Sequence, residues 1–313
     1  MTEIIVEICQ NHNGKVELIK ELLETARESG AQWAKLQCIY SEDLARRDRF
    51  EQGEFKNGQA TSIRRPFGAE FERLKSLDLD PSVYQKAVTW CKELGLKSMV
   101  TVFSLNRVEE MASLGWDAVK VASYDCASPT LLRALSKKFK RLIVSTGATH
   151  PNEVEEASKI LQGVDHSFLH CTTIYPTPPE AVNLQRMDWL KKFEVPVGFS
   201  DHSPIALTGV NASLIAMWKG AAYVERHFTV LEIDETRDGP VSIRPHHLQQ
   251  MAEFALWPKE QQFEYIQAKI PNYQMYIGDG NLDLTQAELL NRDYYRGRFA
   301  WHNQGKVINN WDT

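Results

Sequence analysis

Two short stretches of this sequence end in side chains that can bind a divalent metal ion. Val195–Ser203 runs into His202, and Tyr223–Thr229 carries His227. Each begins with β-branched or aromatic residues, and the helix-like segment 204–219 separates them, which predicts a strand–helix–strand unit. The carboxyl ends of the two strands in such a unit open on the same side of a sheet. We therefore expect the two imidazoles to lie close enough to share a divalent cation.

A histidine near the core is often only a hydrogen-bonded core residue, and for either one alone we would prefer that interpretation. The position of both at successive strand ends favours the metal site. His170 ends an earlier predicted strand and could be a third ligand or could support one. The sequence leaves both roles open.

A second set of residues combines cations with hydroxyl groups. Lys35 and Lys120 lie inside predicted strands, and the hydroxyl residues of the set stand near strand ends: Thr101, Ser123, Ser145 and Ser200. Such a set suits a small phosphorylated carboxylate, whose charges need charge-assisted hydrogen bonds. The alternative is that the lysines extend their amines to solvent.

Carboxylates form a third set. Glu7 ends the first predicted strand beside the Asn11-His-Asn-Gly14 turn, where it could transfer a proton or only pair with a site lysine. Glu225 shares strand parity with His227, so both side chains are expected to point inward.

The elements that must position these groups alternate strictly along the chain. Strands are expected over 4–8, 33–39, 96–103, 117–122, 142–147, 167–173, 195–203 and 223–229, each followed by a helix. Eight such units match a closed (β/α)₈ TIM barrel, an α/β fold whose catalytic groups lie at the carboxyl ends of the strands. An open doubly wound sheet is the alternative, but no G-x-G-x-x-G follows any strand.

Two regions lack this pattern. We read Tyr40–Arg65 as a long loop on the rim of the barrel, because it is polar and poorly periodic. We expect the barrel to occupy residues 1–260 and a C-terminal extension to occupy residues 261–313. Only one clear helix, over 285–291, is expected in this extension, which covers the barrel or contacts a partner subunit.

Composition excludes several classes of protein. The chain has 313 residues, 43% hydrophobic and 25% charged, with a net charge of -5, which gives no footprint for nucleic acid or an anionic membrane. The five cysteines are scattered without paired spacing, and the N-terminus has neither the basic nor the apolar region of a signal peptide. We expect free thiols and a cytoplasmic location, with no membrane partner.

The motifs taken together resemble the sialic acid synthase family, the phosphoenolpyruvate-dependent nonulosonate synthases. The resemblance runs in family order over about the first 240 residues. It rests on Glu7-Ile-Cys-Gln-Asn-His-Asn-Gly14, Ala34-Lys-Leu-Gln37, Lys120-Val-Ala-Ser123, Ser145-Thr-Gly147, His170-Cys-Thr-Thr-Ile-Tyr-Pro-Thr-Pro178, Gly198-Phe-Ser-Asp-His202 and Glu225-Arg-His-Phe-Thr229.

This resemblance implies condensation of phosphoenolpyruvate with an open-chain amino sugar aldehyde to give a 2-keto-3-deoxy sugar acid and phosphate. It implies a divalent metal held by His202 and His227, with Mn²⁺ preferred over Mg²⁺ or Co²⁺, and a homodimer. Catalytic roles fall to Glu7, Lys35 and Lys120. Phosphoenolpyruvate binding falls to Lys35, Gln37, Thr101, Lys120, Ser123, Ser145, Thr173 and Ser200.

Three departures from the family concern the sugar. Thr173 stands where members often carry Asn, and Arg237-Asp-Gly-Pro-Val241 replaces Gly-Pro-Asp, so Asp238 and Tyr175 are the sugar-binding candidates. The C-terminal antifreeze-like domain of the family is not expected in this chain. We expect the extension to cap the site in its place, within the chain or across a dimer, with Arg292, Arg296, Arg298 and Trp301.

Two other functions stay open at this point. A Schiff-base aldolase would use Lys35 or Lys120 to form an imine with pyruvate. A non-catalytic barrel relative would bind phosphoenolpyruvate without releasing phosphate.

Overall fold

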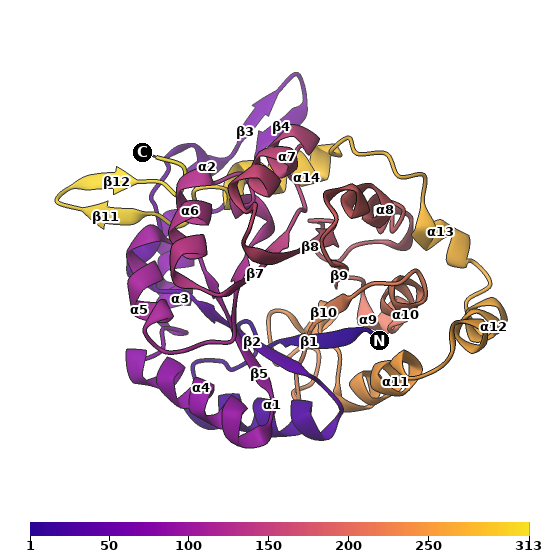
Figure 1. Cartoon of the computed structure of the whole chain (residues 1–313). Coiled ribbons are helices and arrows are strands. Elements are labelled where there is room, and N and C mark those ends of the chain that lie inside the picture. Colours follow the sequence, from indigo (N-terminus) through magenta and orange to yellow (C-terminus); the bar gives the residue numbers. More distant parts are fainter. Residues whose placement is uncertain (313) are drawn as a thin grey trace.

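Eight parallel strands close into a barrel in the computed structural model, which describes residues 1–312 (Figure 1). The strands are β1 (Glu3–Glu7), β2 (Trp33–Cys38), β5 (Lys97–Val102), β6 (Ala118–Val121), β7 (Arg141–Ser145), β8 (Asp165–Cys171), β9 (Val197–Asp201) and β10 (Tyr223–His227). Their hydrogen-bonded order follows the chain, with β10 closing against β1. The predicted (β/α)₈ barrel is confirmed, and each strand lies close to its predicted bounds.

The amino-terminal half of the barrel interior is filled by an apolar layer. Successive residues of a strand point to opposite faces, so each strand contributes one side chain at this level. The layer consists of Ile5, Trp33, Met99, Ala118, Ile143, Leu169 and Tyr223. In β9 the residue at this level is Gly198. A larger residue would not fit there, because its Cβ would lie 2.5 Å from the carbonyl oxygen of Tyr223. The layer closes one end of the barrel, so polar residues two positions further along each strand face the other end.

Helices cover the outside of the barrel. They are α1 (Val16–Glu28), α4 (Pro81–Leu94), α5 (Val108–Ala112), α6 (Pro129–Lys138), α7 (Pro151–Ile160), α8 (Arg186–Leu190), α10 (Asn211–Trp218) and α11 (Pro245–Ala255). A short helix, α9 (Ile205–Thr208), precedes α10. The apolar outer faces of the strands pack against the helices in one continuous core. The outer ring holds the strands, and thus their end residues, in register.

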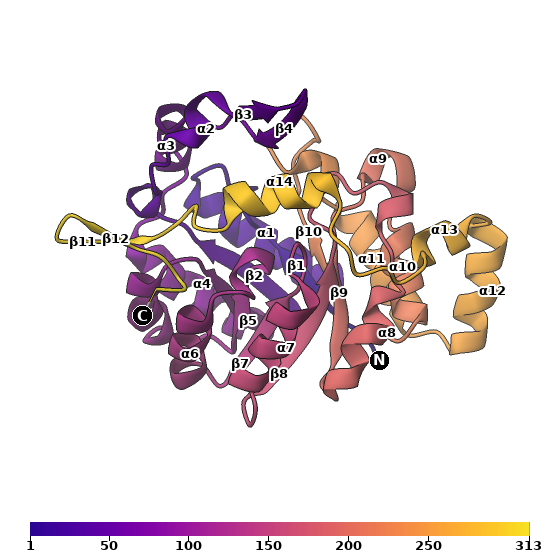
Figure 2. The same cartoon turned by 90° about the horizontal axis from the view of Figure 1, so that it is seen from above.

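The region read as one long rim loop contains regular structure. It holds α2 (Arg49–Gln52) and the hairpin of β3 (Glu54–Lys56) and β4 (Gln59–Ser62), followed by α3 (Phe67–Lys75). Every residue of β3 is exposed, so the sequence carries no alternation that could have revealed the strand. Seen from above, these elements stand at the same end of the barrel as α14 (Figure 2).

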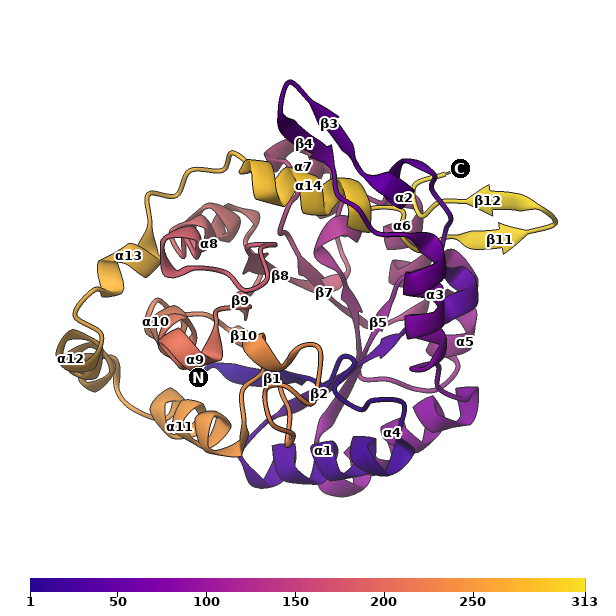
Figure 3. The ribbon, with the colours of Figure 1, turned by 180° about the vertical axis from the view of Figure 1, so that it is seen from behind.

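The C-terminal extension is more structured than the sequence indicated. It contains α12 (Lys259–Lys269), α13 (Tyr273–Ile277), α14 (Gln286–Tyr295) and the hairpin of β11 (Trp301–Asn303) and β12 (Lys306–Ile308). Only α14 was predicted, and α12 starts before the boundary expected at 260/261. The extension passes outside α10 and α8 and then lies beside the mouth of the barrel (Figures 1 and 3). Its outer helices explain why α10 is apolar on nearly every side: α12 and α13 cover it.

Among the described residues, no helix combines the length and the apolarity that a membrane crossing would need. All five cysteines are free thiols, and each is buried.

Candidate active site

One polar or sulfur-bearing side chain from each barrel strand forms the floor of a cavity of about 340 Å³. These residues stand two positions after the apolar layer, and we call them the floor: Glu7, Lys35, Thr101, Lys120, Ser145, Cys171, Ser200 and Glu225. The predicted residues Gln37, Ser123, His202, His227, Tyr175 and Asp238 line the same cavity above the floor. The structure therefore brings together nearly all the predicted site residues.

Two predicted residues do not reach the cavity wall. Thr173 is fully buried, and it is not among the lining residues. His170 points to the outside of the barrel, where its Nε2 lies 2.7 Å from the carbonyl oxygen of Val182 and its ring stacks on Phe199. Its parity on β8 is opposite to that of Cys171, which takes the inward position. His170 is therefore not a third metal ligand beside His202.

Two buried ammonium groups and two buried carboxylates share the floor. Lys35 forms an ion pair with Glu7 and a second one with Glu225 at 3.4 Å. Burial would lower the pKa of Lys35, but the charges of Glu225 and Glu7 outweigh it and raise that pKa. For Glu225, the charges of Lys120 and Lys35 and a 2.9 Å hydrogen bond from Ser200 outweigh burial and lower its pKa. These opposite shifts keep Lys35 and Glu225 ionised.

Lys120 is less completely paired than Lys35. Its Nζ donates to Ser145 Oγ at 2.6 Å and to the carbonyl oxygen of Val121 at 3.2 Å, and the nearest carboxylate oxygen of Glu225 is 3.9 Å away. Burial lowers the pKa of Lys120, and the neighbouring charge of Lys35 acts in the same direction. The nearest counter-ion of Lys120 is thus 3.9 Å away and is shared with Lys35, which favours an incoming anion.

Glu7 is held from three sides. The backbone N–H of Cys9 donates to Glu7 Oε1 at 2.7 Å, Gln37 Nε2 donates to Oε2 at 3.3 Å, and Lys35 pairs with the same oxygen. These contacts fix the orientation of the carboxylate on the floor of the cavity.

The two predicted metal ligands lie side by side at the ends of neighbouring strands, His202 just after β9 and His227 as the last residue of β10. The ring centroids of His202 and His227 are 5.2 Å apart. His202 Nδ1 lies 3.7 Å from the sulfur of Cys171, and the ring of Tyr175 packs against His202 at 4.4 Å. Burial lowers the pKa of His202 far below its usual value, and the charge of His227 adds to this effect. A neutral imidazole is the form that binds a metal ion.

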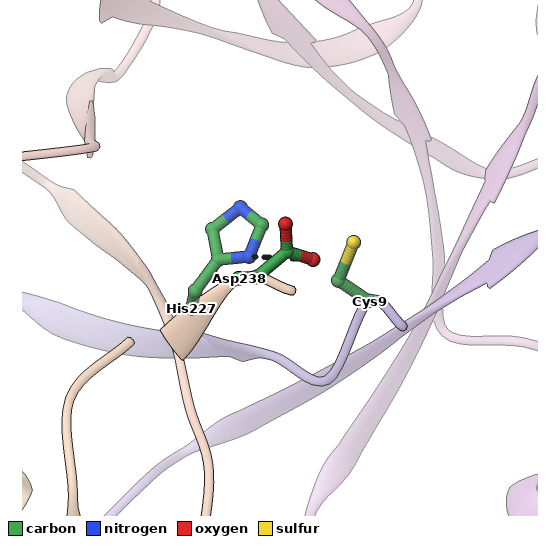
Figure 4. Close-up of side chains that lie close together, drawn as sticks. All are labelled: Cys9, His227 and Asp238. Carbon is green, nitrogen blue, oxygen red and sulfur yellow. Dashed lines mark ion pairs between the residues drawn. The ribbon is translucent and has the colours of Figure 1, made fainter. Parts of the chain in front are cut away.

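Two groups that the sequence had not assigned to a metal lie beside His227. Asp238 Oδ2 is 3.7 Å from His227 Nδ1, and the sulfur of Cys9 joins these atoms in a cluster spanning at most 4.8 Å (Figure 4). Burial raises the pKa of the Cys9 thiol, and the charge of Asp238 raises it further. Cys9 was visible in the sequence as the residue just after the first strand, but its side-chain direction depends on the turn.

That turn ties the end of β1 to the segment after β10. The side-chain amide of Asn11 donates to the carbonyl oxygen of Phe228 at 2.7 Å and to Ser242 Oγ at 3.0 Å. Thr236 Oγ1 donates in turn to Asn11 Oδ1 at 2.6 Å. Gly14 closes the turn at φ +74, where a Cβ would lie 2.6 Å from the carbonyl oxygen of Ser76. The bonds to Asn11 place the loop carrying Asp238 beside the first strand.

The upper wall of the cavity, which we call the rim, consists of Glu70, Arg73, Arg237, Tyr295, Arg298, Phe299 and Asn310. Glu70 pairs with Arg73 at 2.8 Å and with Arg298, and Arg237 lies 3.9 Å from it. Against the effect of burial, the hydrogen bond from Arg73 and the charge of Arg298 lower the pKa of Glu70 to about 2. Three guanidinium groups thus share one carboxylate, which leaves the rim electropositive.

Part of the rim comes from the C-terminal extension of the same chain. The backbone N–H of Ala45 donates to the carbonyl oxygen of Arg298, and Asn310 Nδ2 donates to the carbonyl oxygen of Phe103 and to Asp125 Oδ1, both at 2.8 Å. Of the four residues expected to cap the site, Arg298 lines the cavity. The other three candidates, Arg292, Arg296 and Trp301, do not line the cavity.

Comparisons with known proteins agree with this architecture. A family model described as the NeuB family matches residues 22–256. The N,N'-diacetyllegionaminic acid synthase of Campylobacter jejuni is 29% identical over 308 residues, which cover 94% of this chain and 83% of that protein. The synthase of the same name from Legionella pneumophila is 31% identical over 261 residues, which cover 80% and 70%.

Among solved structures, a sialic acid synthetase from Leptospira borgpetersenii in complex with citrate matches with a TM-score of 0.70. It is 24% identical, and the match covers 94% of this chain and 90% of that one. At this identity the likeness shows the fold alone.

Proposed function

Because this chain belongs to the NeuB family, we propose that it condenses phosphoenolpyruvate with an open-chain amino sugar aldehyde. The products are a nonulosonate, which is a 2-keto-3-deoxy sugar acid, and inorganic phosphate. One observation supports this most directly. The floor presents two buried ammonium groups, Lys35 and Lys120, below the paired imidazoles of His202 and His227.

The floor suits the phosphoenolpyruvate half of the reaction. Phosphoenolpyruvate carries a carboxylate and a phosphate, and anions of this kind are held by ammonium and hydroxyl donors. Lys120 shares its nearest counter-ion, Glu225, with Lys35, and Ser145 beside it supplies a hydroxyl. We assign phosphoenolpyruvate binding to these residues together with the remaining predicted set that lines the cavity: Lys35, Gln37, Thr101, Ser123 and Ser200.

In the proposed reaction, C3 of phosphoenolpyruvate attacks the aldehyde carbon and a carbon–carbon bond forms. The aldehyde oxygen gains a proton, water adds to C2, and the tetrahedral intermediate releases phosphate by cleavage of the C2–O bond. Glu7 is the proposed proton carrier, because its carboxylate lines the cavity. Lys35 pairs with that carboxylate and holds it in place.

The residues at the metal end fit a divalent cation. His227 Nδ1 is buried and makes no hydrogen bond, although a carboxylate oxygen lies 3.7 Å away. We propose that His202 and His227 hold the ion, with Mn²⁺ as the resemblance implies and Mg²⁺ or Co²⁺ as alternatives. When bound, such an ion supplies Lewis-acid polarisation of the aldehyde oxygen.

The sugar side is assigned to the upper cavity. Tyr175 and Asp238 line it beside the histidines, and Arg298 lines it from the extension. The relatives reported above differ in the sugar acid that their names give, diacetyllegionaminic or sialic acid. The aldose is therefore a matter for experiment.

The test is a screen for phosphate release with phosphoenolpyruvate, a divalent metal and a panel of N-acetylated hexosamines and related aldoses. We expect phosphate and a 2-keto acid to form in equal amounts, with loss of both on addition of a chelator. Reactions without aldose control for simple hydrolysis. Binding of phosphoenolpyruvate without phosphate release for every aldose would instead support a non-catalytic barrel.

The lowered pKa of buried Lys120 favours a second candidate, a Schiff-base aldolase. Borohydride would trap that enzyme as a covalent adduct in the presence of pyruvate, and a chelator would not change its activity. Trapping at Lys35 or Lys120, seen as a mass increase on one peptide, would replace the synthase proposal.

We further propose that the protein acts in the cytoplasm as a homodimer. Light scattering coupled to size-exclusion chromatography measures the oligomeric state directly.

A further inference from the structure

We propose that Cys9 is a metal ligand of this site, so that the ion is bound by a mixed set of thiolate, carboxylate and imidazole donors. This set would favour Zn²⁺, Co²⁺ or Fe²⁺ over Mn²⁺ and Mg²⁺. The inference rests on the proposed function only in taking the site to hold a metal ion. It changes which ion the site selects and which residue decides that choice.

The first support is the position of the sulfur. Cys9 lies two residues after the end of β1, and its backbone is in the left-handed region at φ 48. Its N–H is held by Glu7 Oε1 at 2.7 Å, and its side chain lines the cavity. In Figure 4 the sulfur, the carboxylate of Asp238 and the imidazole of His227 face a common space from three separate segments.

The second support is that the facing atoms of the other two groups make no hydrogen bond. His227 Nδ1 and Asp238 Oδ2 are both shielded from solvent, and neither makes a hydrogen bond. A buried polar atom without a partner costs free energy, which a shared cation would remove. Two such atoms side by side point to a bound ligand more strongly than one would.

The spacing suits a small ion. Bonds from zinc to nitrogen, oxygen and sulfur of about 2.0–2.3 Å place neighbouring ligand atoms about 3.3–3.8 Å apart in a tetrahedron. The Nδ1–Oδ2 distance of 3.7 Å falls in that range, and all three ligand atoms lie within 4.8 Å of one another. His202 stands next to this cluster, with its ring 5.2 Å from that of His227, and can supply the fourth donor.

The donor types determine the ion. Manganese and magnesium prefer oxygen ligands, whereas a thiolate and imidazoles select zinc, cobalt and iron(II). Binding replaces the thiol proton of Cys9 with the metal, and that proton is released to solvent. The thiolate strengthens this preference beyond that of the imidazoles, so Cys9 is the specificity-determining residue for the metal.

Cys171 provides a matched control. It is also buried and lines the cavity, and its sulfur lies 3.7 Å from His202 Nδ1. It does not belong to the cluster of Cys9, His227 and Asp238. A test that separates the two thiols therefore decides the proposal.

The experiment uses the whole chain, stripped of metal and without substrates. Titration with Co²⁺ is followed by absorption, since a thiolate bound to cobalt gives an intense charge-transfer band in the near ultraviolet. We expect the band in the wild type and in Cys171→Ala, and its loss in Cys9→Ala. The dissociation constant for Zn²⁺ should rise at least ~10-fold in Cys9→Ala.

A wild type without the band, a band that survives in Cys9→Ala, or a band lost only in Cys171→Ala would overturn the proposal. Alkylation of the wild type covers the case in which Cys9→Ala does not fold. Zn²⁺ should protect Cys9 from iodoacetamide, as measured by mass spectrometry of the peptides, and equal labelling with and without Zn²⁺ would refute the assignment. None of these readouts needs turnover, so a failed aldose screen leaves this result intact.

Discussion

The floor and the rim of the cavity are built in different ways. Each floor residue comes from a barrel strand, at the same level and two positions after an apolar residue. The rim comes from α3, from the loop after β10 and from the C-terminal extension, which are far apart in sequence. A closed sheet dictates the floor, whereas the rim depends on tertiary contacts that can vary between relatives.

The charged groups of the floor are more deeply buried than those of the rim. On the floor, the charges of Lys35 and Glu225 are almost fully buried, so removing one partner leaves the other uncompensated. On the rim, the side chain of Arg237 is 44% exposed and that of Arg73 is 24% exposed, so water screens part of each interaction. We therefore assign chemistry to the floor and sugar selectivity to the rim.

The largest effect should follow from a change on the floor. Lys120→Ala removes a buried cation that we assign to phosphoenolpyruvate, and truncating one partner of such a pair costs roughly 4 kcal/mol, or ~10³-fold in kcat/KM. Steady-state assays of phosphate release measure it. Lys97→Ala is the control. Lys97 begins β5, at the end of the barrel away from the cavity, and its side chain is half exposed. Equal turnover by wild type and Lys120→Ala would contradict the difference drawn between floor and rim.

The next effect concerns Asp125, which joins the barrel to the extension through Asn310. Burial raises the pKa of Asp125 to about 6, against the opposing hydrogen bonds from Asn310 and Ser128. Because the folded-state pKa is raised, ionising this carboxyl group lowers the free energy of unfolding. The loss grows as pH rises from 3.8 to about 6 and is complete above pH 6.

Asp125→Asn removes that ionisation and keeps an oxygen that can accept both hydrogen bonds. It should stabilise the protein by up to about 3 kcal/mol at pH 8, with the gain vanishing near pH 4. Urea denaturation of both proteins at several pH values measures the difference. A gain that does not change with pH would show that the carboxyl is not the cause.

A smaller effect is expected from the rim. Arg298→Ala should raise KM for the aldose about 10-fold, as loss of one charge-assisted contact does, and leave KM for phosphoenolpyruvate nearly unchanged. Trp301→Ala is the matched control, since Trp301 belongs to the extension but not to the cavity wall. If Arg298→Ala instead changed the two KM values equally, the rim would not be specific to the sugar.

The smallest effect should come from Thr173. Its hydroxyl oxygen is buried without a hydrogen-bond partner and lies away from the cavity wall. Thr173→Val keeps the shape and removes that oxygen, so we expect KM for phosphoenolpyruvate to stay within about 2-fold and stability to hold or rise. A large rise in KM would return Thr173 to the set of phosphoenolpyruvate ligands.

The same comparison explains what the sequence could predict. Parity within a strand was enough to predict that Glu225 points inward together with His227, because the period of two is a property of the strand itself. Residues beyond the end of a strand do not follow this alternation. Cys9 turns inward through a left-handed backbone and a turn held by Asn11, neither of which is visible as a pattern.

The residues of the rim could not be predicted from the sequence for a related reason. Glu70 sits in α3 among other charged residues, and only the fold brings Arg298 to it across most of the chain. The helix α12 was missed because it buries only Gln262 and Ile266, too few to give helical periodicity. Contacts of this kind depend on where the extension packs, which no local pattern encodes.

The path of the extension also gives the molecule an internal optical probe. The indole of Trp311 lies under the guanidinium of Arg296, at 4.5 Å, and a Cβ on Gly297 would lie 2.8 Å from its ring. Gly297 and its neighbour Arg298 line the cavity. Tryptophan emission from this position should therefore shift when an aldose enters, and binding could be followed without a label or a coupled assay.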